Sequence, residues 1–233
     1  DSNIVVLHED KCMKVLADKN ALYNADGGKN VAISANFLGS DQPFATKYGI
    51  STNPESCATD LAGRLYFADR TRGAVLRLSN DGITNISDYG MKDWFNDHLN
   101  PHTTKILGTF DQKKGLYNIT IEGKVEPKVS DNPTLSGKGK GSGKREEDFG
   151  TSACNKCFDP DIHGLIPFHK TLSFSENSKG WVSFKSFLPE SGVSINNNYY
   201  TFFQGNMYKH HANKYRNVFY SEGYDSSLTV LFN

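Results

Sequence analysis

The chain has 233 residues, a length that all-β proteins often use as a single domain. Its 26 basic and 26 acidic residues give a formal net charge of zero, so it gains no general attraction to nucleic acid or to anionic membranes. Hydrophobic residues make up only 37%, but Phe and Tyr are abundant, with 15 and 11 copies. A core of aromatic and β-branched side chains suits pleated strands.

Targeting signals are not evident. No apolar run approaches the roughly 20 residues of a membrane-spanning helix, and the first residues lack the basic and apolar regions of a secretory signal. The first residue is not Met, so the chain is either processed or a segment of a longer protein. Because both ends are strand-like, we expect a segment. The scattered Cys12, Cys57, Cys154 and Cys157 are not a disulfide framework, and reduced thiols are the simplest interpretation.

Short strands separated by turn signals dominate the pattern. The first expected hairpin turns at Asp10-Lys11, and Asp81-Gly82 is another turn signal. The expected strands are Asn3–Leu7, Lys14–Ala17, Arg64–Ala68, Ala74–Leu78, Ile83–Ile86, Lys105–Phe110, Leu116–Ile121, Trp181–Phe184, Ser194–Ile195, Tyr199–Phe203, Met207–His210 and Leu228–Phe232.

One helix is predicted, from about Asp88 to Leu99. Ser87 or Asp88 would cap its start, and Met91, Trp94, Phe95 and Leu99 fall at helical spacing. We interpret that apolar stripe as the core face of the helix.

A loose repeat joins two hairpins: an apolar strand, an aspartate, a basic turn ending in Gly, and a second strand. It occurs as YFADRTRGAVLRL and LGTFDQKKGLYNITI. The spacing of roughly 40 residues between the aspartates is that of one propeller blade. Ordinary antiparallel hairpins give the same pattern, so both interpretations stay open. The predicted fold is all-β, a β-propeller-like array of short antiparallel strands with one short helix.

Residues 126–150 interrupt the strands. The run SGKGKGSGKREED contains no apolar residue and cannot offset its ordering entropy, so we predict a flexible linker or loop. It would separate a β-rich part at 1–125 from a second at 151–233, which together could form one continuous domain. The run does not fit a phosphate-binding loop, because Lys138 replaces the required Gly and Arg145 the required Ser or Thr.

The CxxC pair formed by Cys154 and Cys157 is the best metal candidate, with His163 and His169 as possible further ligands. Their spacing differs from common zinc fingers, so we expect no metal, the alternatives being a structural metal clip or a disulfide. His210 and His211 should not share a metal, because strand neighbours point to opposite faces.

Catalytic motifs are also lacking: there is no GxSxG, no HExxH and no Cys with a recognisable partner set. Most aspartates sit at turns, where Asp bonds its own backbone. Two carboxylates facing each other in a cleft would still support glycoside hydrolysis. We predict a protein that is not an enzyme, with no catalytic residues and no cofactor.

Trp181 begins the strand-like segment WVSFK. Strict alternation would put Val182 and Phe184 on one face and Trp181 with Ser183 and Lys185 on the other. We expect the indole to pack within the chain, under the strand Tyr199–Phe203, rather than against another chain.

Several unusual stretches occur in order along the chain. They are NALYNADG (Asn20–Gly27), YGISTNPESCA (Tyr48–Ala58), RLYFADRTRGAVLRLSNDGITNIS (Arg64–Ser87), GMKDWF (Gly90–Phe95), LGTFDQKKGLYNITI (Leu107–Ile121), KGWVSFKSFLPESGVSINNNYYTF (Lys179–Phe202) and GNMYKHH (Gly205–His211). Together they resemble a segment of large virion structural proteins of tailed bacteriophages, nearest to those of marine and cyanobacterial phages. The lysine-glycine run and CNKC are not features of that family.

This resemblance implies a virion protein of the tail, baseplate or neck, assembled in the host cytoplasm with other virion structural proteins as oligomeric partners. It implies no catalytic residues. The alternative is a propeller-type binding module that recognises a host surface glycan or receptor. Exposed Trp and Tyr side chains gathered in one cleft would favour that alternative.

Overall fold

The computed structural model describes residues 3–23, 28–125 and 165–228. Over these ranges the chain forms several antiparallel sheets and one α-helix, α1 (Lys92–His98), so the predicted all-β class is confirmed. No closed barrel or propeller is detected in this part of the chain. The helix in the described ranges is too short to span a membrane.

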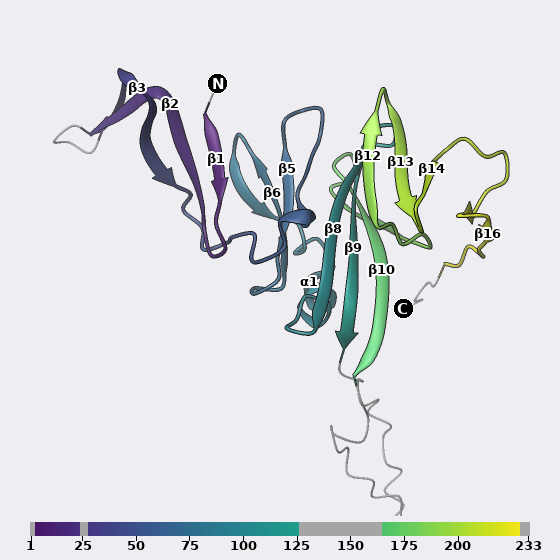
Figure 1. The fold of residues 1–233 in the computed structure, drawn as a ribbon. Coiled ribbons are helices and arrows are strands. Elements are labelled where there is room, and N and C mark those ends of the chain that lie inside the picture. Colours follow the sequence, from purple (N-terminus) through teal and green to yellow (C-terminus); the bar gives the residue numbers. More distant parts are fainter. Residues whose placement is uncertain (1–2, 24–27, 126–164, 229–233) are drawn as a thin grey trace, which may run out of the picture.

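The first sheet is a three-stranded meander. It contains β1 (Ile4–Leu7), β2 (Cys12–Tyr23) and β3 (Lys29–Pro43). The predicted hairpin of β1 and β2 is confirmed. The long ribbon of β2 and β3 was not predicted, and its far end projects away from the other sheets (Figure 1).

The second and third sheets are four-stranded meanders. The second follows a short 3-10 turn, η1 (Pro54–Ser56), and contains β4 (Ala58–Thr59), β5 (Leu65–Asp69), β6 (Ala74–Ser79) and β7 (Gly82–Asn85). The third contains β8 (Thr103–Asp111), β9 (Leu116–Val125), β10 (Ile166–Ser175) and β11 (Gly180–Lys185). The hairpins expected at DRTRG, Asp81-Gly82 and DQKKG are confirmed.

The predicted linker at 126–150 lies outside the described residues. The strands on either side of residues 126–164, β9 and β10, pair with each other from Leu116 to Val125. Strands from both sides of this segment therefore belong to the same sheet.

The fourth sheet contains β12 (Ser191–Ile195), β13 (Asn198–Phe203) and β14 (Asn206–Lys209). A small pair, β15 (Val218–Phe219) and β16 (Glu222–Gly223), follows it. The last predicted strand, Leu228–Phe232, lies outside the described residues apart from Leu228, which is in no strand.

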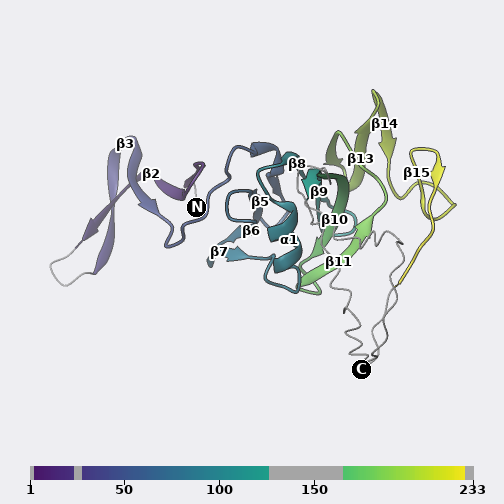
Figure 2. The same cartoon turned by 90° about the horizontal axis from the view of Figure 1, so that it is seen from below.

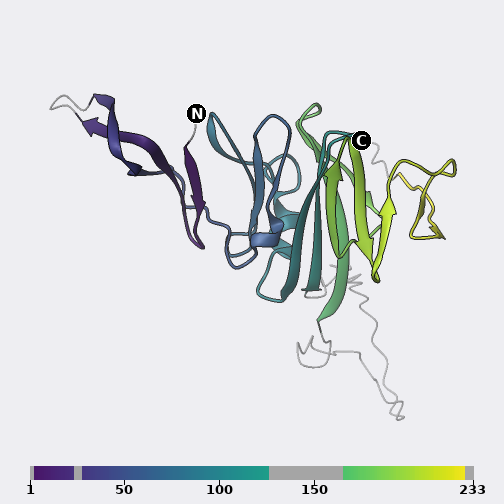
Figure 3. The same ribbon diagram turned by 45° about the horizontal axis from the view of Figure 1, so that its top comes forward.

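The sheets stand in a row in chain order, face to face (Figures 2 and 3). One buried apolar cluster joins the first sheet to the second, where Cys12 meets Phe67 and Leu76. A second joins the second sheet and α1 to the third, where Tyr66 meets Tyr117 and Phe174. The second sheet is therefore covered on both faces, and the fourth sheet contacts the third through β12 and β13 against β8. This burial is the main stabilising contribution.

The helix begins later than predicted. It starts at Lys92 after Met91, and no side chain caps it. Ser87, one of the two predicted caps, instead hydrogen-bonds Asn85. Phe95 and Leu99 are buried, whereas Met91 and Trp94 are only partly buried against the same cluster. The stripe is thus a core face, as predicted.

The two aspartates of the proposed hairpin repeat do not occupy equivalent strands of their sheets. Asp69 ends β5, the second strand of its sheet, whereas Asp111 ends β8, the first strand of the next. Both aspartates accept a hydrogen bond from a turn N–H, that of Arg72 or Lys114. The shared pattern therefore reflects the chemistry of these turns rather than a one-blade repeat.

The alternation predicted around Trp181 is wrong because of a β-bulge. Trp181 pairs with Phe174 and Ser183 with Ser173, so Val182 is the extra residue. The bulge puts Trp181 and Phe184 on the same side of the sheet, where both meet aromatic residues of α1. The indole packs within the chain, as expected, but beside α1 rather than under β13.

Candidate functional site

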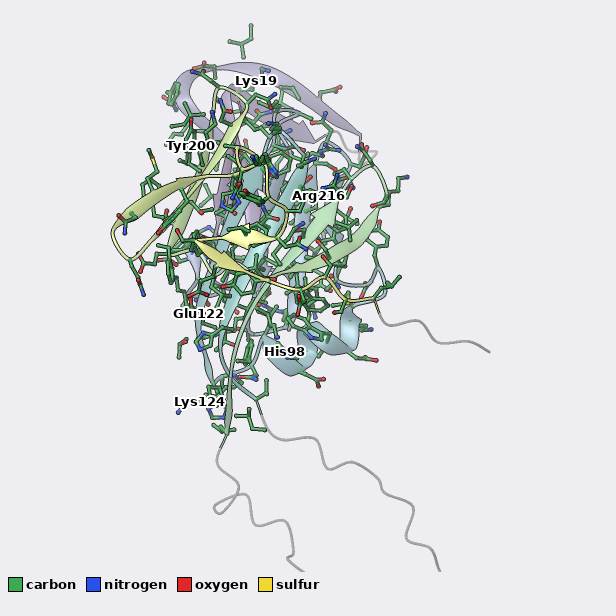
Figure 4. All side chains as sticks on the ribbon, turned by 90° about the vertical axis from the view of Figure 1, so that its right-hand side faces the viewer. Lys19, His98, Glu122, Lys124, Tyr200 and Arg216 are labelled. Atoms are coloured by element: carbon green, nitrogen blue, oxygen red, sulfur yellow. The ribbon has the colours of Figure 1, made fainter. Side chains whose placement is uncertain are left out.

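The metal candidates fall mostly outside the structure. Cys154, Cys157 and His163 are not among the described residues. His169 lies on β10, exposed, with Nδ1 3.8 Å from Glu122 Oε2. Figure 4 shows Glu122 well away from Tyr200 of the fourth sheet. Within the described ranges, no group of three or more His, Cys, Asp and Glu side chains could hold a metal ion.

The two adjacent histidines have separate partners, although they lie in the turn after β14 rather than in the predicted strand, and both line the same cavity. His210 is buried and its Nε2 lies 2.7 Å from Thr201 Oγ1, beside the rings of Phe187 and Tyr199. Burial lowers the pKa of His210 from 6.5 to about 4, and this imidazole is therefore neutral at pH 7.

His211 instead reaches back to the third sheet. Its Nε2 lies 2.6 Å from Asp111 Oδ2, although the two residues are 100 positions apart. The backbone of His211 has a φ of 59°, an uncommon conformation for a residue other than Gly. Asp111 is only 3% exposed, whereas His211 is partly exposed, so the contact joins a buried carboxylate of the third sheet to a residue near the surface.

That interface is unusually polar. Tyr199 OH lies 2.8 Å from Thr109 Oγ1, and Thr120 Oγ1 lies 2.8 Å from Thr171 Oγ1. The Thr171 hydroxyl also donates to the carbonyl of Phe187. Such buried hydroxyls are tolerated because each finds a partner. The sequence pattern did not reveal this layer, because it is formed by residues on strands that are distant along the chain.

Both tryptophans belong to the packing around α1: Trp94 is part of the helix, and Trp181 of β11 packs against it. Trp181 Nε1 donates to the carbonyl of Ile86 at 2.9 Å, and its ring contacts Phe95 and Phe174. Trp94 stacks on His98, with ring centroids 3.9 Å apart. These contacts account for both indoles structurally.

The end of the long β2–β3 hairpin is the most exposed apolar surface of the described chain. We call residues 17–23 and 28–40 the outer ribbon. Its large apolar side chains are strongly exposed, from 53% to 94%. They are Leu22, Val31, Ile33, Phe37 and Leu38. Patches of this kind commonly mark contacts between proteins.

The edges of the outer ribbon are also open. β1 pairs with β2 only as far as Val15, so beyond it β2 has β3 as its only described neighbour. The far edge of β3 carries no described strand. Unpaired strand edges offer N–H and C=O groups to another strand. The Asp26-Gly27 dipeptide is a turn signal that could have pointed to this hairpin from the sequence.

The row of sheets ends in a second apolar surface. On β12 and β14 the side chains of Val193, Ile195 and Met207 are 41%, 54% and 63% exposed. Val193 pairs with Tyr200, whose position on β13 is labelled in Figure 4. This face of the fourth sheet and the outer ribbon lie toward opposite ends of the row (Figure 2).

Comparison with known proteins identifies no relative. No protein-family model, curated protein or solved structure matches the chain.

Proposed function

We propose that this protein is a structural component of a tailed-bacteriophage virion, part of the tail, baseplate or neck, that acts through protein–protein assembly contacts. The observation that carries the proposal is the outer ribbon, with its five strongly exposed apolar side chains and its open edges. The resemblance of the seven sequence stretches to virion structural proteins supports the same role.

The energetics of the outer ribbon favour a partner. An isolated two-stranded hairpin is at best marginally stable in water. Val31 and Ile33 project from one face of β3, since they are two residues apart in a regularly paired segment. Both are exposed, Ile33 to 94%. Covering these side chains with another protein would release about 25 cal/mol for each Å² of apolar surface removed from water.

We further propose that the sheets are consecutive blades of a propeller-like array. Each sheet is a meander with its strands in chain order. The first strands of three successive sheets, β4, β8 and β12, lie in contact in the order of the chain. This is the arrangement of the inner strands in a propeller. Rigid, face-to-face sheets would hold the outer ribbon in a fixed direction.

The receptor-binding alternative receives less support. It predicts Trp and Tyr side chains gathered and exposed in a cleft, but Trp94 of α1 and Trp181 of β11 both pack against the apolar core. Their indole rings contact the chain's own Phe95. The assembly role needs no such cleft, only exposed complementary surfaces, and is therefore the function that we propose.

The test is a double substitution in the outer ribbon, Val31→Lys with Ile33→Lys. The variant should keep the denaturation midpoint of the unmodified protein, because both side chains are exposed. It should fail to enter particles when it replaces the original protein in phage-infected cells. Leu61→Lys is the matched control, since Leu61 is 79% exposed in a turn outside the ribbon. Normal incorporation of the ribbon variant would contradict the proposal.

A further inference from the structure

A cavity of about 330 Å³ opens where the third sheet, the fourth sheet and the β15–β16 pair meet. Its volume is within the usual range of small-molecule sites, about 300–1,000 Å³. The lining combines charged, polar and aromatic side chains from all three elements. They are Asp111, Lys114, Leu116, Asn118, Lys185, Phe187, Tyr199, His210, His211 and Phe219.

The carboxylate in this cavity is already engaged by the protein. Asp111 Oδ2 contacts His211 Nε2 at 2.6 Å, and Asp111 Oδ1 accepts a hydrogen bond from the backbone N–H of Lys114 at 3.2 Å. Both oxygens therefore have partners, and Asp111 orients His211 at the cavity. A ligand would meet the histidine more readily than the carboxylate.

Lys185 is a charged group of the lining without such a partner. It is half-buried on β11, where it pairs with Thr171 of β10 and lines the cavity. Its amine forms no ion pair or hydrogen bond with any residue of the described ranges. Burial lowers the pKa of Lys185, Asp111 raises it, and Lys114 lowers it further.

The charge balance of the lining favours an anion. Lys114 and Lys185 contribute two positive charges against the single negative charge of Asp111. A partly desolvated ammonium is costly until it meets an opposite charge or a hydrogen-bond acceptor. A carboxylate offers both and forms strong charge-assisted hydrogen bonds with lysine.

The remaining wall is suited to an organic body. Phe187 and Phe219 lie with ring centroids 5.2 Å apart, and both line the cavity. Aromatic walls with a few well-placed polar groups are typical of small-molecule sites. Bare inorganic anions would make no use of these rings.

We propose that this cavity binds a small organic carboxylate, with its carboxylate group on Lys185 Nζ and its body against Phe187 and Phe219. An acidic sugar of the uronate type has this chemistry. The inference does not depend on the assembly role, because the cavity lies on the third and fourth sheets and the outer ribbon on the first.

The test uses the full chain in isothermal titration calorimetry with D-glucuronate, D-glucose and inorganic phosphate as probes. Glucuronate should bind, and both glucose and phosphate should bind at least about tenfold more weakly. Lys185→Met keeps the aliphatic stem and should weaken glucuronate binding at least about tenfold. Lys185→Arg, which keeps the charge, should retain part of the affinity.

Lys209→Met is the matched control, since Lys209 is an exposed lysine that does not line the cavity. It should leave the affinity unchanged. The thermal midpoint of each variant shows whether it remains folded. If Lys185→Met misfolds, the glucuronate affinity of Lys185→Arg is compared with that of Lys209→Met instead. The proposal would be overturned if glucuronate does not bind, or if glucose or phosphate binds equally well. It would also be overturned if Lys185→Met leaves the glucuronate affinity unchanged.

Discussion

At the residue scale, Trp181 links three elements. It lies on β11, donates its indole N–H to the carbonyl of Ile86 after β7, and packs against Phe95 of α1. The hydrogen bond satisfies the polar atom of a ring that otherwise lies in an apolar cluster. The side chain therefore connects β11, the edge strand of the third sheet, to α1 and to the end of the second sheet.

Replacing this indole should be costly. Trp181→Ala removes the ring contacts and leaves the carbonyl of Ile86 without that donor. We expect the free energy of unfolding to fall by about 3 kcal/mol, near the lower end for a large aromatic side chain. Chemical denaturation measures this directly. Val182→Ala is the matched control, because Val182 is 47% exposed, and should cost less than about 1 kcal/mol.

His210 makes stability depend on pH. Its pKa is about 4 in the folded protein, below the ordinary value of 6.5 that applies to the unfolded chain, mainly because burial disfavours the charged imidazole. The neighbouring His211 lowers this pKa further, Asp111 raises it, and Lys185 lowers it. The folded protein thus binds this proton less readily than the unfolded chain, so acidification favours unfolding.

The expected consequence is a loss of stability on acidification. The contribution of His210 is complete above pH 6.5 and disappears as the pH falls toward about 4. The total loss should be about 2–4 kcal/mol. His210→Gln keeps a hydrogen-bonding side chain without this titration, so its stability should fall less between these two pH values. Identical pH profiles of the two proteins would show that His210 is not responsible.

At the element scale, the outer ribbon depends on a close approach of its two strands. Asp18, with a φ of 55°, lies at a register shift, where the strand pairing passes from Ala17 opposite Leu38 to Lys19 opposite Ile33. Just beyond, a Cβ on Gly39 would lie 1.7 Å from the backbone oxygen of Lys19. The strands can be this close only because position 39 has no side chain.

Gly39→Ala should therefore loosen the ribbon without unfolding the sheets. Backbone atoms block the added methyl group, so the strands must separate there. Trypsin should cleave after Lys19 about tenfold faster, in line with a local cost of about 1–3 kcal/mol. Gly223→Ala is the control, because a Cβ there meets nothing within 4 Å. An unchanged cleavage rate would contradict the ribbon geometry.

At the scale of the whole molecule, the row of sheets is held by specific contacts as well as by apolar burial. Tyr117 of the third sheet donates its hydroxyl to the carbonyl of Ser56 before the second sheet, at 2.8 Å. In the same way, the hydroxyl of Tyr199 in the fourth sheet hydrogen-bonds the hydroxyl of Thr109 in the third. In both cases a tyrosine on the second strand of one sheet binds an earlier part of the chain, Ser56 of η1 or Thr109 of β8.

Close packing at the same junction gives a further prediction. A Cβ on Gly108 of β8 would lie 1.8 Å from the backbone oxygen of Ser56. Gly108→Ala should push the second and third sheets apart and destabilise the protein by about 1–3 kcal/mol. The denaturation midpoint measures this loss, with Gly223→Ala again as the control. A midpoint equal to that of the control would mean that the sheets adjust freely.

Local features of the sequence predicted much of the fold. The turns at DRTRG, DQKKG and Asp81-Gly82 contain residues whose own backbone preferences produce tight connections, and their hairpins formed as predicted. The helix was predicted from its apolar spacing, although its start was placed four residues too early. Helix ends depend on capping contacts that spacing does not reveal.

The candidate site was largely beyond such local patterns. Asp111 and His211 are 100 residues apart, and the bulge at Val182 puts Trp181 on the opposite side of the sheet from Ser183 and Lys185. The sequence alone determined where strands and turns occur, because these follow from neighbouring residues. The tertiary structure decided which face each side chain occupies and which strands meet, because one extra residue in a paired strand reverses the alternation.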